Sequence, residues 1–105
     1  MDRRIETRVI DTGGVAGSAL IQKDACEVWW LAISPETPTI AGVLKLYDGF
    51  DATGKLELQI EKAAAQIDNF IPPIPCDHGI FVTWDAKIAS FTIAYRGKGW
   101  PREQK

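Results

Sequence analysis

Two short polar stretches carry the residue types that could do chemistry. In YDGFDATGK, residues 47–55, Asp48 and Asp51 offer carboxylates of the kind that bind calcium, and two glycines raise the question of a phosphate-binding loop. Two side-chain ligands are too few for calcium, the EF-hand spacing is not met, and no Gly-Lys-Ser/Thr ending leads into a helix. Gly49 and Gly54 suit tight turns, so we interpret the stretch as a hairpin connection without metal or phosphate.

The second stretch, PCDHG, holds the single histidine, His78, near Cys76. A Cys-His nucleophilic pair requires the imidazole to reach the thiol, which near neighbours in one loop seldom achieve. A zinc site would need three or four ligands, and Cys26 is the one other cysteine. We therefore predict no catalytic residue, no cofactor, no metal site and no enzyme activity. The enzyme alternative would return if Cys76 had a depressed thiol pKa and His78 were essential.

The two cysteines, Cys26 and Cys76, lie far apart in the chain. The sequence leaves open whether they pair, and burial as two small thiols is the simpler interpretation.

Composition limits the classes of partner. The chain has 105 residues, 46% of them hydrophobic and 25% charged, which is typical of one globular domain. A net charge of −2 and scattered Lys and Arg argue against nucleic acid as a partner. The longest apolar run, VWWLAI at 28–33, is far shorter than the ~20 residues of a membrane-spanning helix, and the charged start leads into no signal sequence. We expect neither membrane insertion nor secretion through a cleaved signal.

Alternation of apolar and polar residues predicts strands. In KLELQIEK, residues 55–62, the side chains of Leu56, Leu58 and Ile60 are expected on one buried face, with Glu57 and Glu61 in solvent.

Four further apolar, β-branched and aromatic segments look like two hairpins. Residues 28–34 and 40–48 are separated by SPETP, and residues 79–85 and 88–96 by a short connection. We therefore expect the two strands of each hairpin to be hydrogen-bonded to one another.

The rest of the chain adds shorter strands and turns. RIETRVI and SALIQ flank the glycine-rich DTGGVAG turn, and AQIDNF precedes a break at IPPIP. The alanines of EKAAAQIDNF favour at most a turn or one helical turn. Crossover helices are lacking, so the sequence predicts an all-β fold: a single-domain antiparallel β-sandwich or jelly roll of about eight short strands over residues 1–97. Residues 98–105 are expected to form a polar C-terminal tail.

The aromatic residues are the candidate partner-binding side chains. Trp29 and Trp30 are adjacent, so in a regular strand they point to opposite faces, and one of them is available for a partner. Trp84 shares the parity of Ile80 and Val82 and is expected in the core. Trp100 lies in the tail, where it either anchors a partner or folds back onto the domain.

A resemblance appears in VLKLYDGFDATGKLELQI, followed by FIPPIPCDHGIFVTW and ASFTIAYR. Over roughly residues 40–97 the chain resembles a group of short phage virion-associated β-proteins. In these an apolar strand ending in Tyr-Asp-Gly, a turn of small residues and a Leu-rich strand are followed by a loop with Pro or Gly, a Gly-Leu/Ile-Tyr/Phe-Val strand and a final strand ending in Tyr. The resemblance implies a structural role on a phage particle and carries over no catalytic residue.

We therefore expect a virion structural protein, made in the host cytoplasm, of the capsid decoration (cement) type. Its expected partners are the major capsid protein or other virion proteins, and homo-oligomerisation would suit attachment to a symmetric lattice. A neck or tail component is an alternative. A second alternative is a carbohydrate-binding module in which Trp29 or Trp30, together with Tyr47, stacks on sugars.

Overall fold

The computed structural model describes residues 5–35, 41–62 and 66–97. These residues form eight strands and no helix, so the all-β prediction is confirmed. The strands are β1 (Glu6–Asp11), β2 (Gly17–Gln22), β3 (Cys26–Pro35), β4 (Gly42–Asp48), β5 (Lys55–Lys62), β6 (Gln66–Cys76), β7 (Ile80–Trp84) and β8 (Ile88–Gly97). The tail, residues 98–105, lies outside the described residues, and so does the alanine-rich connection at 63–65.

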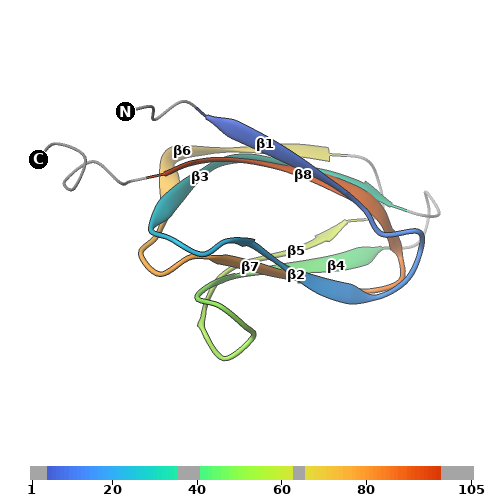
Figure 1. Cartoon of the computed structure of the whole chain (residues 1–105). Helices are drawn as coiled ribbons and strands as arrows, with labels where there is room; N and C mark the ends of the chain where they lie inside the picture. Colours follow the sequence, from blue (N-terminus) through green and yellow to red (C-terminus); the bar gives the residue numbers. More distant parts are fainter. Residues whose placement is uncertain (1–4, 36–40, 63–65, 98–105) are drawn as a thin grey trace, which may run out of the picture.

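Two four-stranded antiparallel sheets face each other (Figure 1). Sheet A has the strand order β1-β8-β3-β6, and sheet B has the order β2-β7-β4-β5. The pairing grows outward from one hairpin: β4 pairs with β5, β3 with β6, β2 with β7, and β1 with β8. The described chain is thus a long two-stranded ribbon, with the loop 49–54 at its tip, rolled up so that the ribbon alternates between the sheets. This arrangement of eight strands in two sheets is a jelly roll.

The ribbon stays hydrogen-bonded where it turns from one sheet to the other. At one corner the backbone N–H of Thr12 donates to the carbonyl of Ala89 at 3.0 Å, and the Thr12 hydroxyl donates to the carbonyl of Ile88. Gly13 and Gly14 in this corner have φ values of 64° and 74°, which glycine adopts without steric cost. Within sheet B, Asp85 N–H donates to the carbonyl of Val43 at 3.2 Å, which continues the pairing of β7 with β4.

The hydrophobic core lies between the sheets. Alternate residues of the strands point inward, which buries one side of each sheet and leaves the other side outward. Sheet A contributes Leu31, Ile33, Phe91 and Ile93, and sheet B contributes Leu44, Leu46, Ile80 and Val82, all at most 2% exposed. Trp84 is half-buried and packs against this core, with its ring centroid 5.3 Å from that of Phe91.

Both hairpins expected between neighbouring segments are wrong. β3 and β4 lie in different sheets, and so do β7 and β8. β3 pairs instead with β6 and β8, while β7 pairs with β2 and β4. The connections therefore cross from one layer of the sandwich to the other, and only the connection 49–54 closes a hairpin between consecutive strands of the described chain.

The expected break at IPPIP is also wrong. β6 continues through Pro72, Pro73 and Pro75, with a cis peptide bond between Ile71 and Pro72. Proline cannot donate a ladder hydrogen bond, and it is tolerated here because β6 is an edge strand of sheet A and its pairing with β3 is irregular between Val28 and Trp30.

Candidate partner-binding surfaces

The outer face of sheet B carries an apolar row that crosses all four strands. Leu20 of β2 is in register with Phe81 of β7, Phe81 with Tyr47 of β4, and Tyr47 with Leu56 of β5. The chain neighbours of Tyr47, Phe81 and Leu20, which are Leu46, Val82 and Ile21, are buried in the core, so these three side chains lie on the outward side. Leu56 lies opposite Tyr47 and is on the same side. We call Leu20, Phe81, Tyr47 and Leu56, together with Phe50 of the adjoining loop, the aromatic stripe.

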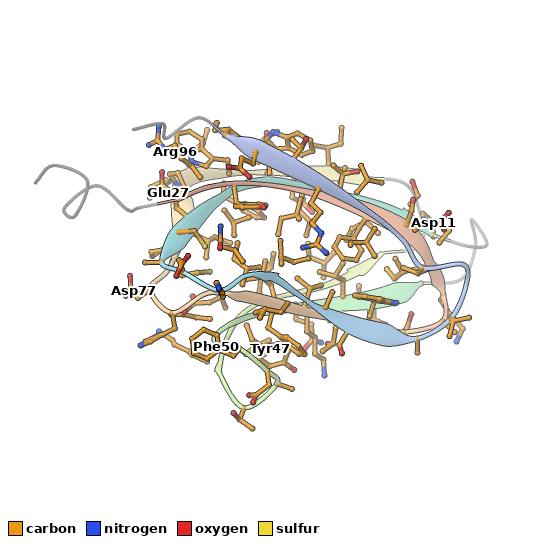
Figure 2. The ribbon with its side chains drawn as sticks, viewed as in Figure 1. Asp11, Glu27, Tyr47, Phe50, Asp77 and Arg96 are labelled. Carbon is orange, nitrogen blue, oxygen red and sulfur yellow. The ribbon has the colours of Figure 1, made fainter. Side chains whose placement is uncertain are left out.

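The members of the aromatic stripe are accessible. Leu20 is 41% exposed, Leu56 is 47% exposed and Phe50 is 58% exposed. The rings of Tyr47 and Phe81 are half-buried and lie with centroids 6.3 Å apart at an interplanar angle of 53°, a tilted packing that fixes both rings. Figure 2 labels Tyr47 and Phe50 on the outer side of sheet B. The result is an ordered apolar surface rather than scattered single side chains.

A bulge places Leu56 on this surface. The sequence predicted that Leu56, Leu58 and Ile60 share the buried face, but the pairing of β4 with β5 shifts register between Leu46 and Tyr47. Ile60 is buried and Leu58 packs against the core, whereas Leu56 is turned outward opposite Tyr47. The prediction is therefore correct for two of these residues and wrong for Leu56.

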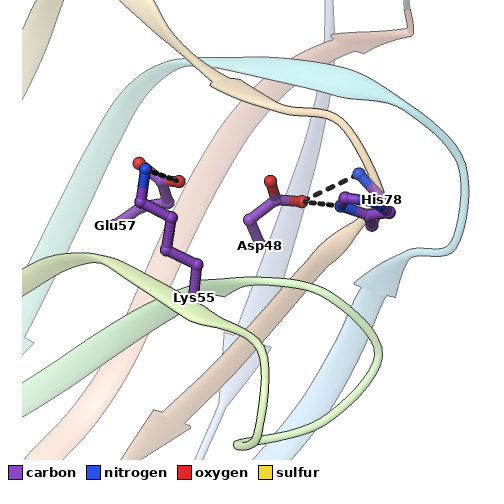
Figure 3. Close-up of polar contacts among 4 residues, drawn as sticks. All are labelled: Asp48, Lys55, Glu57 and His78. Carbon is purple, nitrogen blue, oxygen red and sulfur yellow. Dashed lines mark hydrogen bonds and ion pairs between the residues drawn. The ribbon is translucent and has the colours of Figure 1, made fainter.

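An open hollow adjoins the stripe at Phe50, which belongs to its lining. It has a volume of about 660 Å³ and lies between the β4–β5 loop and the turn before β7. Its charged lining is mostly acidic: Asp48, Asp51, Glu57 and Asp77, with Lys55 and His78. Lys55 Nζ lies 3.9 Å from Glu57 Oε2 (Figure 3). The aromatic stripe thus ends at a rim of carboxylates.

Asp48 connects the two walls of the hollow. Its Oδ1 accepts a hydrogen bond from the backbone N–H of His78 at 2.8 Å and lies 3.5 Å from His78 Nδ1 (Figure 3). Burial of Asp48, whose side chain is 9% exposed, by itself raises the pKa of the carboxyl. Backbone hydrogen bonds from His78 and Asp77 and the charge of His78 outweigh this effect, and the pKa is lowered overall. The charged Asp48 side chain therefore links the end of β4, at the base of the hairpin loop, to the turn at residues 77–79.

Asp51 organises the tip itself. Its carboxylate accepts hydrogen bonds from the hydroxyl and the backbone N–H of Thr53, and these bonds lower its pKa. The carbonyl of Asp51 also accepts from Gly54 N–H at 3.1 Å. The two aspartates that resembled metal ligands in the sequence therefore serve the turn and its neighbour, as the hairpin interpretation expects.

The outer face of sheet A holds both adjacent tryptophans. The expectation that they point to opposite faces is wrong, because β3 contains a bulge between Val28 and Trp30. Before the bulge residues 26 and 28 are buried, and after it residues 31 and 33 are buried, so the inward positions are even-numbered before it and odd-numbered after it. Trp29 and Trp30 both occupy outward positions and are half-buried. Trp30 is in register with Ala94, whose neighbours Ile93 and Tyr95 are the inward residues.

Trp29 is held by two charged residues. Its Nε1–H donates to Glu27 Oε2 at 3.0 Å, and the Arg96 guanidinium lies 5.0 Å from the centre of its ring. Arg96 Nη2 also donates to Glu27 Oε2 at 2.9 Å. Glu27 and Arg96 are labelled near one end of sheet A in Figure 2. The polar edge of Trp29 is thus satisfied within its own sheet.

The structure separates the four candidate residues. Trp29 and Trp30 belong to the outer face of sheet A, Tyr47 belongs to the outer face of sheet B, and Trp100 lies outside the described residues. A sugar-stacking platform built from either Trp29 or Trp30 with Tyr47 is therefore not formed. Leu20, Phe50 and Phe81 were missed as site residues, although the position of Phe81 between Ile80 and Val82 already placed it on the outward side of a strand.

Cys76 and His78 have different surroundings. Cys76 is fully buried in the core cluster, while His78 lies at the surface against Asp48. Across residues 5–35, 41–62 and 66–97, no group of three or more His, Cys, Asp or Glu side chains could hold a metal ion. The hollow therefore offers hydrogen-bond acceptors and charge, and the stripe offers apolar contact.

Comparison with protein-family models, with curated proteins and with solved structures finds no match for this chain. Within the described part of the chain, no helix is long and apolar enough to cross a membrane.

Proposed function

We propose that this chain is a structural protein of a phage virion, of the capsid decoration type, and that it binds the major capsid protein or another virion protein through the aromatic stripe. The observation that carries this proposal is the continuous row of Leu20, Phe81, Tyr47 and Leu56, which crosses sheet B from edge to edge on its outer face. The resemblance of residues 40–97 to short phage virion-associated β-proteins supplies the class of partner.

The composition of the stripe supports protein binding. Aromatic side chains give a large contact area, and an apolar centre with a charged rim is the usual anatomy of a protein interface. Here the apolar centre is the stripe, and the rim is the acidic lining of the hollow, including Asp51, Glu57 and Asp77. A partner with an apolar patch beside basic side chains would complement both parts.

Several copies on one particle would strengthen the attachment. A symmetric shell presents the same docking site many times, and a homo-oligomer of this chain would engage several sites at once. The same surface would also suit a neck or tail component, because the stripe specifies an apolar partner rather than a position on the particle. In either form the chain is made in the host cytoplasm and ends in the virion.

Binding to purified particles that lack this chain tests the proposal. Replacing Leu20, Phe50 and Leu56 together with serine removes the exposed apolar atoms of the stripe and leaves the core residues in place. We expect the dissociation constant to rise by roughly tenfold or more. The matched control replaces Val9, Ile67 and Ile71, which are 67%, 64% and 92% exposed on strands of sheet A, with serine. The control should stay within about twofold of the original protein.

Two results would contradict the proposal. Failure of the original protein to bind any such particle would remove the virion function. Loss of binding in the sheet A control, with unchanged binding in the stripe variant, would move the docking surface to the other face.

A carbohydrate-binding module is the second candidate. Jelly rolls occur both in viral capsid proteins and in lectins, so the fold alone does not decide between them. The observation that favours it is that Phe50 lines the hollow together with the carboxylates of Asp51 and Glu57, because sugars stack on aromatic rings and donate hydroxyl hydrogen bonds to carboxylates. Glycan-array binding by the original protein, lost on Phe50→Ser, would favour this candidate over the virion protein.

A further inference from the structure

Cys26 and Cys76 lie directly opposite each other. They are register partners in the antiparallel pairing of β3 with β6. Both are fully buried and belong to the same core cluster, so both side chains are on the inward side of sheet A. Two cysteines fifty positions apart in the sequence thus occupy facing positions in the fold.

Facing positions on antiparallel strands satisfy the distance requirement of a disulfide. Opposite residues have Cα atoms about 4.5 or 5.5 Å apart, depending on whether the pair is hydrogen-bonded. Disulfides span Cα separations of about 4.4 to 6.8 Å, so either kind of pair lies within reach. Because both side chains project from the same face of the sheet, no strand would have to rotate to bring the sulfurs together.

We propose that Cys26 and Cys76 form an intrachain disulfide site, oxidised by a small disulfide such as oxidised glutathione. The thiolate of one cysteine attacks a sulfur of the small disulfide, whose S–S bond breaks and releases one small thiol. The second cysteine then attacks the protein sulfur of this mixed disulfide, forms the Cys26–Cys76 bond and releases the second small thiol. The protein thiols lose two electrons and two protons, and the small disulfide gains them.

The two cysteines are placed where strand ends can open. Cys26 is the first residue of β3, and Cys76 is the last residue of β6. β6 is an edge strand, and its regular pairing with β3 at this end covers only residues 74–76 before the bulge interrupts it. Local opening at this end therefore breaks few hydrogen bonds between the strands. The bridge would then tie this edge strand to the interior strand β3.

Oxidation should stabilise the fold. A bridge between residues 26 and 76 closes a loop of about fifty residues, which restricts the unfolded chain far more than the native one. For a domain of this size we expect the melting temperature of the oxidised protein to exceed that of the reduced protein by about 10 °C.

The test compares the full chain after exposure to excess oxidised glutathione with the same protein reduced by dithiothreitol. We expect the oxidised protein to be about 2 Da lighter, to stay a single chain in non-reducing electrophoresis, and to resist alkylation at both cysteines when it is unfolded in denaturant, where the reduced protein is alkylated. Dithiothreitol should reverse the mass change and the rise in melting temperature. The Cys26→Ala/Cys76→Ala variant should show no redox-dependent shift, but the test does not depend on its folding.

Three results would overturn the inference: stable glutathione adducts on both cysteines, a bridge between two copies of the chain, or unchanged thiols after unfolding and refolding with the oxidant. None of these results bears on binding to phage particles, so failure of the disulfide site and failure of the proposed function can be told apart.

Discussion

Gly79 lies where two corners of the sandwich and the hairpin tip meet. Its φ is +151°, a conformation that side-chain-bearing residues rarely adopt, and a Cβ there would lie 2.6 Å from the carbonyl oxygen of Gln22. It would also lie 3.1 Å from the carbonyl oxygen of Gly49, whose N–H donates to the Gly79 carbonyl at 3.3 Å. This glycine allows the turn before β7 to pack against both the corner at Gln22 and the tip of the ribbon.

We predict that Gly79→Ala lowers the free energy of unfolding by about 2–3 kcal/mol, because the new Cβ meets backbone atoms that have little room to move. Gly13→Ala is the matched control, since Gly13 also has positive φ (64°) but a Cβ there would meet no atom within 4 Å. The control should lose only about 1 kcal/mol, the cost of the left-handed backbone. Urea denaturation measures both; equal losses would contradict the packing explanation.

Asp48 gives the fold an acid-sensitive contact. Its pKa in the folded protein is lowered from 3.8, so its contribution to stability is complete above that value and is lost as the pH falls through the lower, folded value. Asp48→Asn should cost about 1 kcal/mol at pH 7, and the difference from the original protein should shrink below about pH 4.

Denaturant titrations at several pH values test this prediction. The control is Asp24→Asn, which changes an exposed carboxylate in the corner between β2 and β3. It should change stability little at any pH. A deficit of Asp48→Asn that persists unchanged at pH 3 would show that the charge of Asp48 is not what matters.

At the scale of the strands, alternation predicted where strands lie but not every face. The strand character of residues 55–62 was correct, and so was the hairpin turn before it. The faces predicted for Leu56 and for the adjacent tryptophans were wrong. A bulge in the pairing of β5 with β4, and another in the pairing of β3 with β6, each shift the alternation by one residue. A bulge depends on the partner strand, and a single strand's sequence carries no direct signal for it. The aromatic stripe could therefore be predicted only in part.

The contact between Tyr47 and Phe81 joins two central strands of sheet B. A double-mutant cycle with Tyr47→Ala and Phe81→Ala should give a coupling free energy of about 0.5–1.5 kcal/mol, since tilted aromatic pairs stabilise beyond their buried area. The control cycle combines Tyr47→Ala with Val9→Ala, which lies on the outer face of the other sheet, and should give a coupling near zero. Coupling of the same size in both cycles would mean that the rings do not interact specifically.

At the scale of the whole molecule, the sequence predicted the class of fold but not the order of the strands. Strands that follow each other in the chain were expected to pair, as they do in simple hairpins. In the rolled ribbon β3 pairs with β6 and β1 with β8, so most partners are distant in sequence. Connections that cross between sheets, such as residues 12–16, and hairpin turns are built from the same residue types, glycine and aspartate. The local sequence therefore does not distinguish the two kinds of connection, which differ only in how the two sheets close over the common core.

The most direct test of the proposed function is the copy number of this chain in purified phage particles from its source, measured by quantitative mass spectrometry against the major capsid protein. A decoration protein that docks through the aromatic stripe should be present at one copy per capsid subunit or at a simple fraction of that number. A few copies per particle would contradict the decoration form and favour the neck or tail. Complete absence from the particles would contradict the virion function itself.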